Sequence, residues 1–448
     1  MRCTIGKRLS LQLWLFGLAF LFLRPGALLA RWSQQETGAF QEGGAETRAE
    51  ELLAERRKRL AEVTPAKRSR LVEVLTTMEN DGFDQLVTWQ LGHFRLGFGK
   101  ISPVSGGTPA IQYERPRLGA SPLTLRTAGA YSFRGYQAYE LQLGVFDELP
   151  AREYLGDGFL GAPFDFDNRS QAPLDGHLYS DVLYRNFPRE IYYGLGTESL
   201  EENRSVFGID VSSIDLVTGY QVTRWLGFQG RVGFGKPTIS EGRDDKLPNT
   251  QDLFDESTAP GLESQPDYLR YEAAVYMGWE GDPNRSAAEV GLRAARYEDL
   301  DEGRYQFTRA SVDLRGHLPL GSRQRTLSAR VFASSDFEDG GSVVPFYLMK
   351  TLGGHDTLRG YRDFRFRDAN VLYLSAEYRW EATAGIELAL FYDTGKVFPD
   401  TSDFNFEDLK DSFGFGIRGK SLRRVVFRLD LGHSEEGTFV YIAFGPSF

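Results

Sequence analysis

From about residue 107 to the end of the chain, apolar and polar residues alternate in short runs. In 308–315, TRASVDLR, Ala310, Val312 and Leu314 share one face, and the polar and charged residues share the other. Alternation with a period of two predicts β-strands. By itself it does not separate a soluble β-sandwich from a transmembrane β-barrel, because both structures alternate.

The lengths of the connections between these runs separate the two cases. Taken as strands, the alternating runs number sixteen, and in this numbering every connection from an even to an odd strand is short. The long connections all follow an odd strand; they are 148–176, 237–267, 337–370 and 395–411. The predicted strands are 107–118, 121–131, 136–147, 177–186, 190–197, 205–222, 225–236, 268–281, 286–298, 305–319, 325–336, 371–380, 385–394, 412–420, 423–432 and 437–448.

Short turns on one rim and long loops on the other are typical of an outer-membrane barrel. We therefore predict an all-β fold, a sixteen-stranded antiparallel transmembrane β-barrel over residues 107–448. An even number of strands brings both ends of the barrel to the short-turn rim, which in such barrels faces the periplasm.

The first thirty residues predict a secretory signal peptide. A basic start is followed by the apolar run 9–23 and by small residues up to Ala30, so 1–30 is the predicted signal peptide. A single membrane-anchor helix is the alternative, but the run is short for a span of about 20 residues. The one cysteine, Cys3, precedes the apolar run, so neither a lipid anchor nor a disulfide is predicted in the mature chain.

Residues 31–106 predict a partly disordered helical arm in the periplasm. Residues 31–45 are polar and rich in glycine, and the apolar spacing in 46–80 is helical. The basic run ERRKRL, residues 55–60, has two interpretations: a solvated helix face, which we prefer, or a helix that plugs a pore or docks on a partner.

Composition and motifs argue against several functions. A formal net charge of -10 opposes binding to nucleic acid, which needs a clustered positive surface. The five histidines are scattered, and the sequence contains no H-E-x-x-H and no G-x-S-x-G motif. Glycine-rich stretches such as 413–416 are predicted as strand rather than as phosphate loops, because no helix opens after them. Calcium binding by the acidic loop 241–267 is less favoured than a solvated surface. We predict no enzyme activity, no cofactor and no metal site.

An arginine-rich loop is the feature that carries a candidate site. The segment 357–368, TLRGYRDFRFRD, places four arginines in the longest connection, 337–370. On the next two strands, Glu377 and Asp393 fall on the polar face, which points into the barrel lumen. One guanidinium from a loop folded into the lumen could bind both carboxylates, because its planar fork can bond two partners.

This loop resembles a family signature. The segment LRGY, Leu358, Arg359, Gly360 and Tyr361, is similar to the V-R-G-F/Y motif of the BamA/TamA-type outer-membrane assembly superfamily, the bacterial surface antigen family. Around it, LGG and FYDTG also fit the family pattern; they contribute Gly353, Gly354, Phe391 and Gly395. A second copy, FRGY at 133–136, sits in a short connection and predicts an ordinary turn.

The resemblance implies a fold and a set of contacts. It implies a sixteen-stranded barrel with the signature in the sixth external loop, the position that counting the loops also predicts. It further implies that Arg359 is held by Glu377 and Asp393 and that the aromatic end at Phe448 is the C-terminal strand signal. The chain departs from the family in having no room for its periplasmic repeat domains.

The function implied is outer-membrane protein insertion or translocation, with the lumen closed by the inward-folded loop. The implied partners are outer-membrane lipid, client outer-membrane or secreted proteins, and a possible periplasmic partner of the helical arm. A passive diffusion pore and a structural outer-membrane anchor that binds a periplasmic partner are the alternatives. A diffusion pore would show the same alternation of apolar and polar residues. A structural anchor would bind its periplasmic partner through the helical arm.

Overall fold

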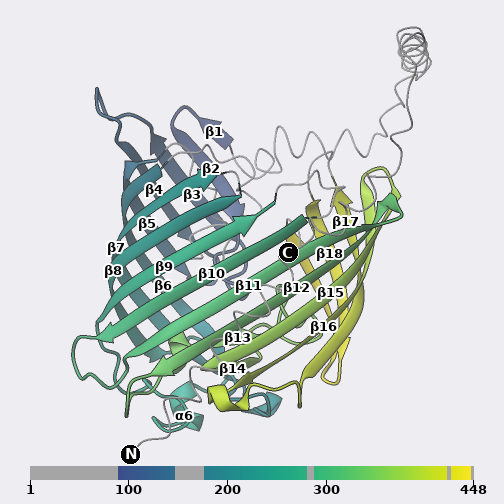
Figure 1. Ribbon diagram of the computed structural model, residues 1–448. Helices are drawn as coiled ribbons and strands as arrows, with labels where there is room; N and C mark the ends of the chain where they lie inside the picture. Colours follow the sequence, from purple (N-terminus) through teal and green to yellow (C-terminus); the bar gives the residue numbers. More distant parts are fainter. Residues whose placement is uncertain (1–88, 147–175, 224, 280–286, 421–424, 445–448) are drawn as a thin grey trace, which may run out of the picture. The chain divides into compact units, whose positions relative to one another are not determined.

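The computed structural model describes residues 89–146, 176–223, 225–279, 287–420 and 425–444. Within these ranges, seventeen strands form one sheet, whose long, tilted strands curve around an interior (Figure 1). Each strand pairs antiparallel with the next one along the chain, except that β12 pairs with β15.

The strands of the large sheet are β1 (Trp89–Leu91), β2 (Phe94–Gly99), β3 (Thr108–Arg115), β4 (Thr124–Tyr131), β5 (Gln137–Val145), β6 (Gly176–Tyr192), β7 (Ser205–Thr223), β8 (Leu226–Glu241), β9 (Tyr268–Gly278), β10 (Ala287–Asp299), β11 (Phe307–Leu320), β12 (Ser322–Glu338), β15 (Asn370–Thr383), β16 (Ile386–Phe398), β17 (Lys410–Lys420), β18 (Val425–Ser434) and β19 (Gly437–Phe444). Between β12 and β15, β13 (Lys350–Leu352) and β14 (Phe366–Asp368) form a separate hairpin. The helical elements are short: α6 (Thr250–Leu253) and 3-10 turns at Glu201–Asn203, Phe346–Leu348 and Thr401–Asp403.

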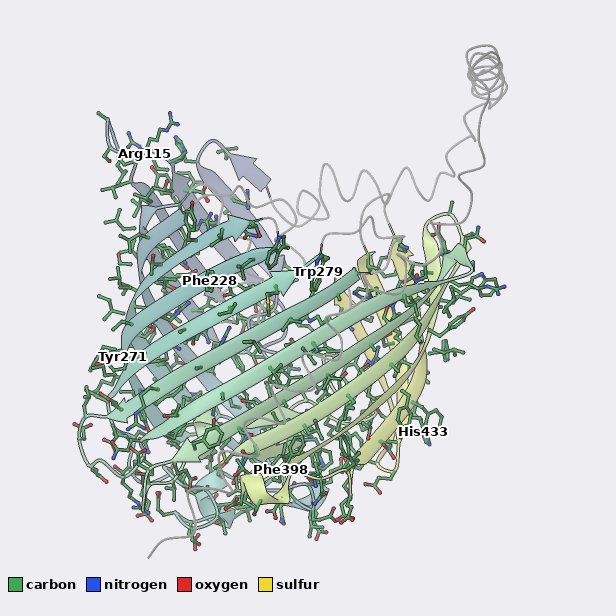
Figure 2. All side chains as sticks on the ribbon, in the orientation of Figure 1. Arg115, Phe228, Tyr271, Trp279, Phe398 and His433 are labelled. Atoms are coloured by element: carbon green, nitrogen blue, oxygen red, sulfur yellow. The ribbon has the colours of Figure 1, made fainter. Side chains whose placement is uncertain are left out.

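The burial pattern of the strands is inverted relative to a soluble protein. In β5, Tyr139, Leu141 and Leu143 are exposed at 45%, 44% and 39%, while Glu140 and Gln142 between them are buried at 8% and 1%. Phe228, Tyr271 and Trp279, labelled in Figure 2, belong to the same exposed apolar set. An apolar outer face and a polar inner face are what a barrel in a bilayer requires, because its outer surface contacts lipid.

Exposed tryptophans mark one rim. Trp225 and Trp279 lie beside the ends of β8 and β9, and Trp380 lies near the turn between β15 and β16. All three are on the short-turn rim, where aromatic residues are enriched at the membrane–water interface. Among the helices of the described ranges, none has the length and apolar content needed to cross a membrane.

Two strand predictions were wrong, and the errors offset each other in the count. The runs 177–186 and 190–197 were predicted as two strands, but β6 (Gly176–Tyr192) is continuous through Pro188. Its pairing with β7 shifts register between Phe187 and Glu190 instead. A β-bulge tolerates proline because the bulged residue need not donate a ladder hydrogen bond.

The other error is a missed strand. β2 (Phe94–Gly99) pairs with β3, so the predicted start of the barrel at residue 107 is too late, and the predicted arm 31–106 includes strands at its end. The alternation of Phe94, Leu96 and Phe98 carried the signal for this strand. Gly97 and Gly99 weakened it, because glycine has low strand propensity.

With the corrected strand count, two connections lie on the opposite rim from the one that was predicted. The connection predicted as 148–176 leaves β5 and enters β6 at the rim of the short turn between β7 and β8, since Val145 pairs with Leu178 and Gly176 with Tyr220. The turn at 132–136 moves to the opposite rim. The connection between β12 and β15 is still the sixth on its rim when β2 is counted first.

Several predictions fall outside the described residues. These are the signal peptide 1–30, the arm up to residue 88, the interior of the connection after β5, and the terminal Phe448.

The largest buried apolar cluster lies at the long-loop rim. It joins side chains of β6, β7, β10 and β11 to the segment 343–349 of the connection between β12 and β15. The Phe346 ring lies 5.0 Å from the Tyr192 ring and 4.9 Å from the Phe207 ring. This connection therefore makes apolar contacts with β6 and β7, which lie far in the sheet from β12 and β15, the strands that it joins.

Candidate functional site

The LRGY segment forms part of a tight turn at the tip of the β13–β14 hairpin. Gly353 and Gly354 have φ values of 111° and 95°, a region that favours glycine. The Gly353 N–H donates to Thr357 Oγ1 at 2.9 Å, and the Gly354 N–H donates to the Tyr361 carbonyl at 3.1 Å. These bonds hold the four signature residues in a fixed conformation.

Arg359 contacts both predicted carboxylates. Its Nε and Nη2 donate to Asp393 Oδ2 and Oδ1, each at 2.8 Å, and its Nη1 donates to Glu377 Oε2 at 3.1 Å. The Arg359 side chain is 2% exposed, and both carboxylates are fully buried. The guanidinium also lies 3.5 Å from the centre of the Phe391 ring, a cation–π arrangement.

Strand register explains why the two acids lie together. Ser375 pairs with Asp393, and Glu377 pairs with Phe391, across β15 and β16. All four residues therefore share one face of the sheet, because side chains alternate along each strand. Ser375 Oγ also donates to Asp393 Oδ1 at 2.7 Å, which orients the carboxylate toward the loop.

The site extends over two further strands that the sequence interpretation did not connect to it. Arg418 of β17 lies 2.6 Å from Glu377 and 3.1 Å from Asp430 of β18. Arg379 lies 3.0 Å from Glu377, and Arg428 lies 3.5 Å from Asp430. The charged face of RVVFRLDL was visible in the sequence, but the register of this strand, β18, against β17 was not. The inner wall is thus a buried network of alternating charges.

Close backbone approach explains Gly360 and Gly395. A Cβ on Gly360 would lie 2.6 Å from Ser412 Cβ and 2.8 Å from the His433 backbone. A Cβ on Gly395 would lie 2.6 Å from the Leu372 carbonyl oxygen. The Gly360 carbonyl also accepts a hydrogen bond from Ser434 Oγ. The loop tip therefore lies directly against β17 and β18.

The two apolar signature residues are buried. Leu358 and Tyr361, 0% and 1% exposed, belong to a cluster with Val371, Tyr373 and Val397 of β15 and β16. The Tyr441 hydroxyl of β19 donates to the Tyr361 carbonyl.

The other three arginines of the loop bind elsewhere. Arg362 Nε donates to Glu201 Oε1 at 2.8 Å. Arg365 donates to Ser199 through Nη1 and Nη2 and to Glu436 Oε1 through Nε, at 2.9, 2.6 and 2.6 Å. Arg367 Nη1 donates to the Phe346 carbonyl at 2.9 Å. The sequence pointed to none of these partners; Glu201, Ser199 and Glu436 lie between 71 and 166 residues away along the chain.

A histidine, His355, lies beside the tip and is one of the titratable groups of the loop. His355 Nε2 lies 3.0 Å from Asp356 Oδ2, and its Nδ1 lies 3.8 Å from Asp363 Oδ1. Burial alone would lower the pKa of His355, but the adjacent Asp356 carboxylate outweighs it and raises the pKa to about 9.

The second RGY copy forms a short turn between β4 and β5. The Ser132 N–H donates to the Tyr136 carbonyl at 2.8 Å, and Phe133 is 78% exposed. Within the described ranges, no group of three His, Cys, Asp or Glu side chains is arranged to hold a metal ion.

The fold and the site together define a class of protein: a transmembrane β-barrel in which an arginine of one connection is bound to carboxylates of β15 and β16. Residues 295–432, from β10 into β18, match the Omp85 superfamily domain. This match spans the hairpin, Glu377 and Asp393, and it covers less than half of the chain.

One solved structure is similar to the chain at the level of the fold, and two others align less well. BamA from Haemophilus ducreyi lacking POTRA domains 1-3 aligns with a TM-score of 0.51 at 12% identity, over 79% of this chain and 68% of that chain. CdiB from Escherichia coli aligns with a TM-score of 0.49 at 12% identity, over 79% of this chain and 62% of its own. For CdiB from Acinetobacter baumannii the values are 0.43, 11%, 80% and 60%. The chain thus spans less than two thirds of each CdiB, and no curated protein matches it.

Proposed function

We propose that this protein is an outer-membrane insertion or translocation factor whose lumen is closed by the connection between β12 and β15. Arg359 acts as a latch that holds the loop tip on the inner wall, with Asp393 and Glu377 as its acceptors. The observation that carries this proposal is the burial of that guanidinium between two buried carboxylates of adjacent strands.

Two further observations support a closed lumen. The acceptors lie on the polar face of β15 and β16, opposite the exposed Leu390 and Tyr392. A loop tip bound to that face is inside the barrel, since the apolar face contacts lipid. The Omp85-type domain supports the assignment to insertion or translocation. The mechanism needs no covalent chemistry and no cofactor; it depends on releasing and rebinding one ion-paired loop.

The partners follow from this role. The exposed apolar face binds outer-membrane lipid, and the clients are outer-membrane or secreted proteins. A periplasmic partner of the N-terminal arm is the remaining partner we propose, with the arm on the periplasmic side.

Single-channel conductance in a planar bilayer tests the closed lumen. We expect the full protein to be nearly closed and a deletion of residues 355–367 to give a wide, steady pore. Equal and steady conductance in both proteins would instead identify a diffusion pore, the second candidate.

A folding assay tests the insertion role separately. The protein is reconstituted in lipid vesicles, and the folding of a urea-unfolded outer-membrane barrel protein is followed by protease protection. Faster folding than in empty vesicles is expected. Equal folding rates in both kinds of vesicle would exclude insertion as the function and leave translocation or passive diffusion.

A further inference from the structure

The arginines that follow Arg359 connect the loop to a second region of the barrel. Arg365 is 3% exposed, and its fork binds both the hydroxyl and the main-chain oxygen of Ser199, in the connection between β6 and β7. Its Nε binds Glu436, in the turn between β18 and β19. The guanidinium also lies 5.0 Å from the centre of the Tyr193 ring. A buried arginine with this many directed bonds is a fixed contact rather than a solvated one.

Neighbouring contacts strengthen this second region. The Gly196 N–H donates to the Arg367 carbonyl at 2.9 Å, and Arg362 pairs with Glu201. Phe346, from the same connection as the hairpin, packs on Tyr192 and Phe207. Ion pairs, backbone bonds and apolar contacts thus all join this loop to β6, β7 and the connection between them.

The two regions are far apart in the sheet. Counted from β2, and without the hairpin strands β13 and β14, β6 is the fifth strand and β16 is the thirteenth. In a rolled sheet of sixteen strands, positions eight apart face each other across the interior. The loop therefore contacts opposite walls: Arg359 binds β15 and β16, and Arg365 binds the β6–β7 connection as well as Glu436 in the turn between β18 and β19.

The β6–β7 connection also touches the far wall directly. Thr197 Oγ1 donates to the Val397 carbonyl at 2.7 Å and accepts from the Val397 N–H at 3.1 Å. Val397 belongs to β16, the strand that carries Asp393. These two bonds hold the β6–β7 connection in place, which lowers the conformational entropy lost when Arg365 binds Ser199.

We propose that the connection between β12 and β15 is a cross-brace with two independent anchors, the Arg359 latch on β15–β18 and an Arg365 anchor on the β6–β7 region. Release of either anchor leaves the loop held across the lumen by the other. This inference rests on the proposed closure of the lumen and adds a second element that maintains it.

The test is a double-mutant comparison of channel opening. The variants are Arg359→Ala, Arg365→Ala and the double variant, and the control is Arg243→Ala, an exposed arginine on the same rim. Each variant is purified from outer membranes, checked for the folded form by its mobility in unheated SDS gels, and recorded in planar bilayers. The deletion of residues 355–367 defines the fully open conductance.

We expect each single variant to raise the open probability by about tenfold and the double variant by roughly the product of the two effects, because independent sites add in free energy. Arg243→Ala stays at the wild-type value. The second anchor is disproved if Arg365→Ala matches that control, or if the double variant opens no more than Arg359→Ala alone.

Two further measurements separate the possible failures. If Arg365→Ala does not fold, Arg365→Lys replaces it, since lysine keeps the charge but cannot bind Ser199 and Glu436 together. If the deletion of residues 355–367 leaves the conductance unchanged, the closed lumen itself fails. If the deletion opens the pore but the double variant behaves like Arg359→Ala, only the brace fails.

Discussion

At the scale of single residues, the Arg359 site shows how a buried charge is tolerated. Asp393 binds two nitrogens of the guanidinium, Glu377 binds a third, and the Phe391 ring covers its face. A buried ion pair of this kind is not itself strong evidence of stability, because desolvation offsets much of the attraction. Removal of one partner is costly, however, since a buried charge then lacks its counter-ion.

Arg359→Ala is therefore expected to lower the free energy of unfolding by about 3–5 kcal/mol, the range for breaking a buried ion pair. Urea unfolding of the protein in lipid vesicles measures this change. Arg243→Ala, an exposed arginine, serves as the control and is expected to stay within about 0.5 kcal/mol of wild type. A similar small change in both variants would mean that water screens the site.

His355 predicts a pH dependence of the loop. Its pKa is raised to about 9 in the folded protein, against about 6.5 when unfolded. The protonated form is thus favoured by folding, so the contribution is complete below pH 6.5 and is lost as the pH rises through about 9. Asp356 and Asp363 supply the negative charge, while Arg428 opposes it.

Limited proteolysis of the loop between pH 6 and pH 10 measures this effect. Protection is expected to fall as the pH rises toward 10 in wild type and to change less in His355→Gln, which has no titrating ring. Identical pH profiles for the two proteins would assign the dependence to other groups.

Gly360 predicts a steric effect at the tip. Its Cα approaches β17 and β18 so closely that an added Cβ would lie 2.6 Å from Ser412 Cβ. Gly360→Ala is expected to destabilise the seated loop by about 1–3 kcal/mol, the usual range for overpacking. Gly340→Ala, in the same connection, has no atom within 4 Å of the new Cβ and is the matched control. Equal protease sensitivity of the two variants would contradict tight seating of the tip.

At the scale of elements, each strand is divided into a lipid face and an inner face. β5 is the clearest example, since its apolar residues are exposed and its polar residues are buried. The β13–β14 hairpin is the second such element, because its tip places the LRGY turn against β17 and β18. The bulge in β6 is the third, since it lets one strand continue through Pro188.

Leu141→Arg tests the lipid face of β5. Leu141 lies in the middle of the strand and is 44% exposed, so arginine there is expected to cost about 2–4 kcal/mol, as at the bilayer midplane. Leu253→Arg, at an exposed position in α6 outside the strands, should cost little. Unfolding titrations in vesicles compare the two variants, and equal costs would argue that β5 does not face lipid.

At the scale of the whole molecule, the connections of one rim cooperate. The loop between β12 and β15 meets the loop between β6 and β7 and the turn between β18 and β19, through contacts such as Arg365 with Ser199 and Glu436. These segments are 166 and 71 residues apart in the chain. Closure of the lumen is in this view a property of several connections together, which the double-mutant comparison tests.

The sequence alone predicted the strand periodicity and singled out Arg359, Glu377 and Asp393. These features are local: alternation records which face of a strand contacts lipid, and the LRGY turn needs glycine where the backbone approaches the wall. The same locality explains the errors. The glycines of β2 hid that strand, and Pro188 in β6 suggested a turn. In both cases the pairing with the neighbouring strand decided the structure, and the local sequence does not contain that pairing. The sorting of loops by length failed for the connection after β5, whose two ends lie on the short-turn rim.

Only the tertiary structure decided the register and the partners at long range. The contacts of Arg418 with Glu377 and Asp430 depend on how β15, β17 and β18 are aligned. The contact of Arg365 with Ser199 depends on how the sheet curves to bring distant strands together. The physical reason is that a guanidinium can pair with any carboxylate or carbonyl within reach, and in a barrel the reach is set by the rolled sheet rather than by position along the chain.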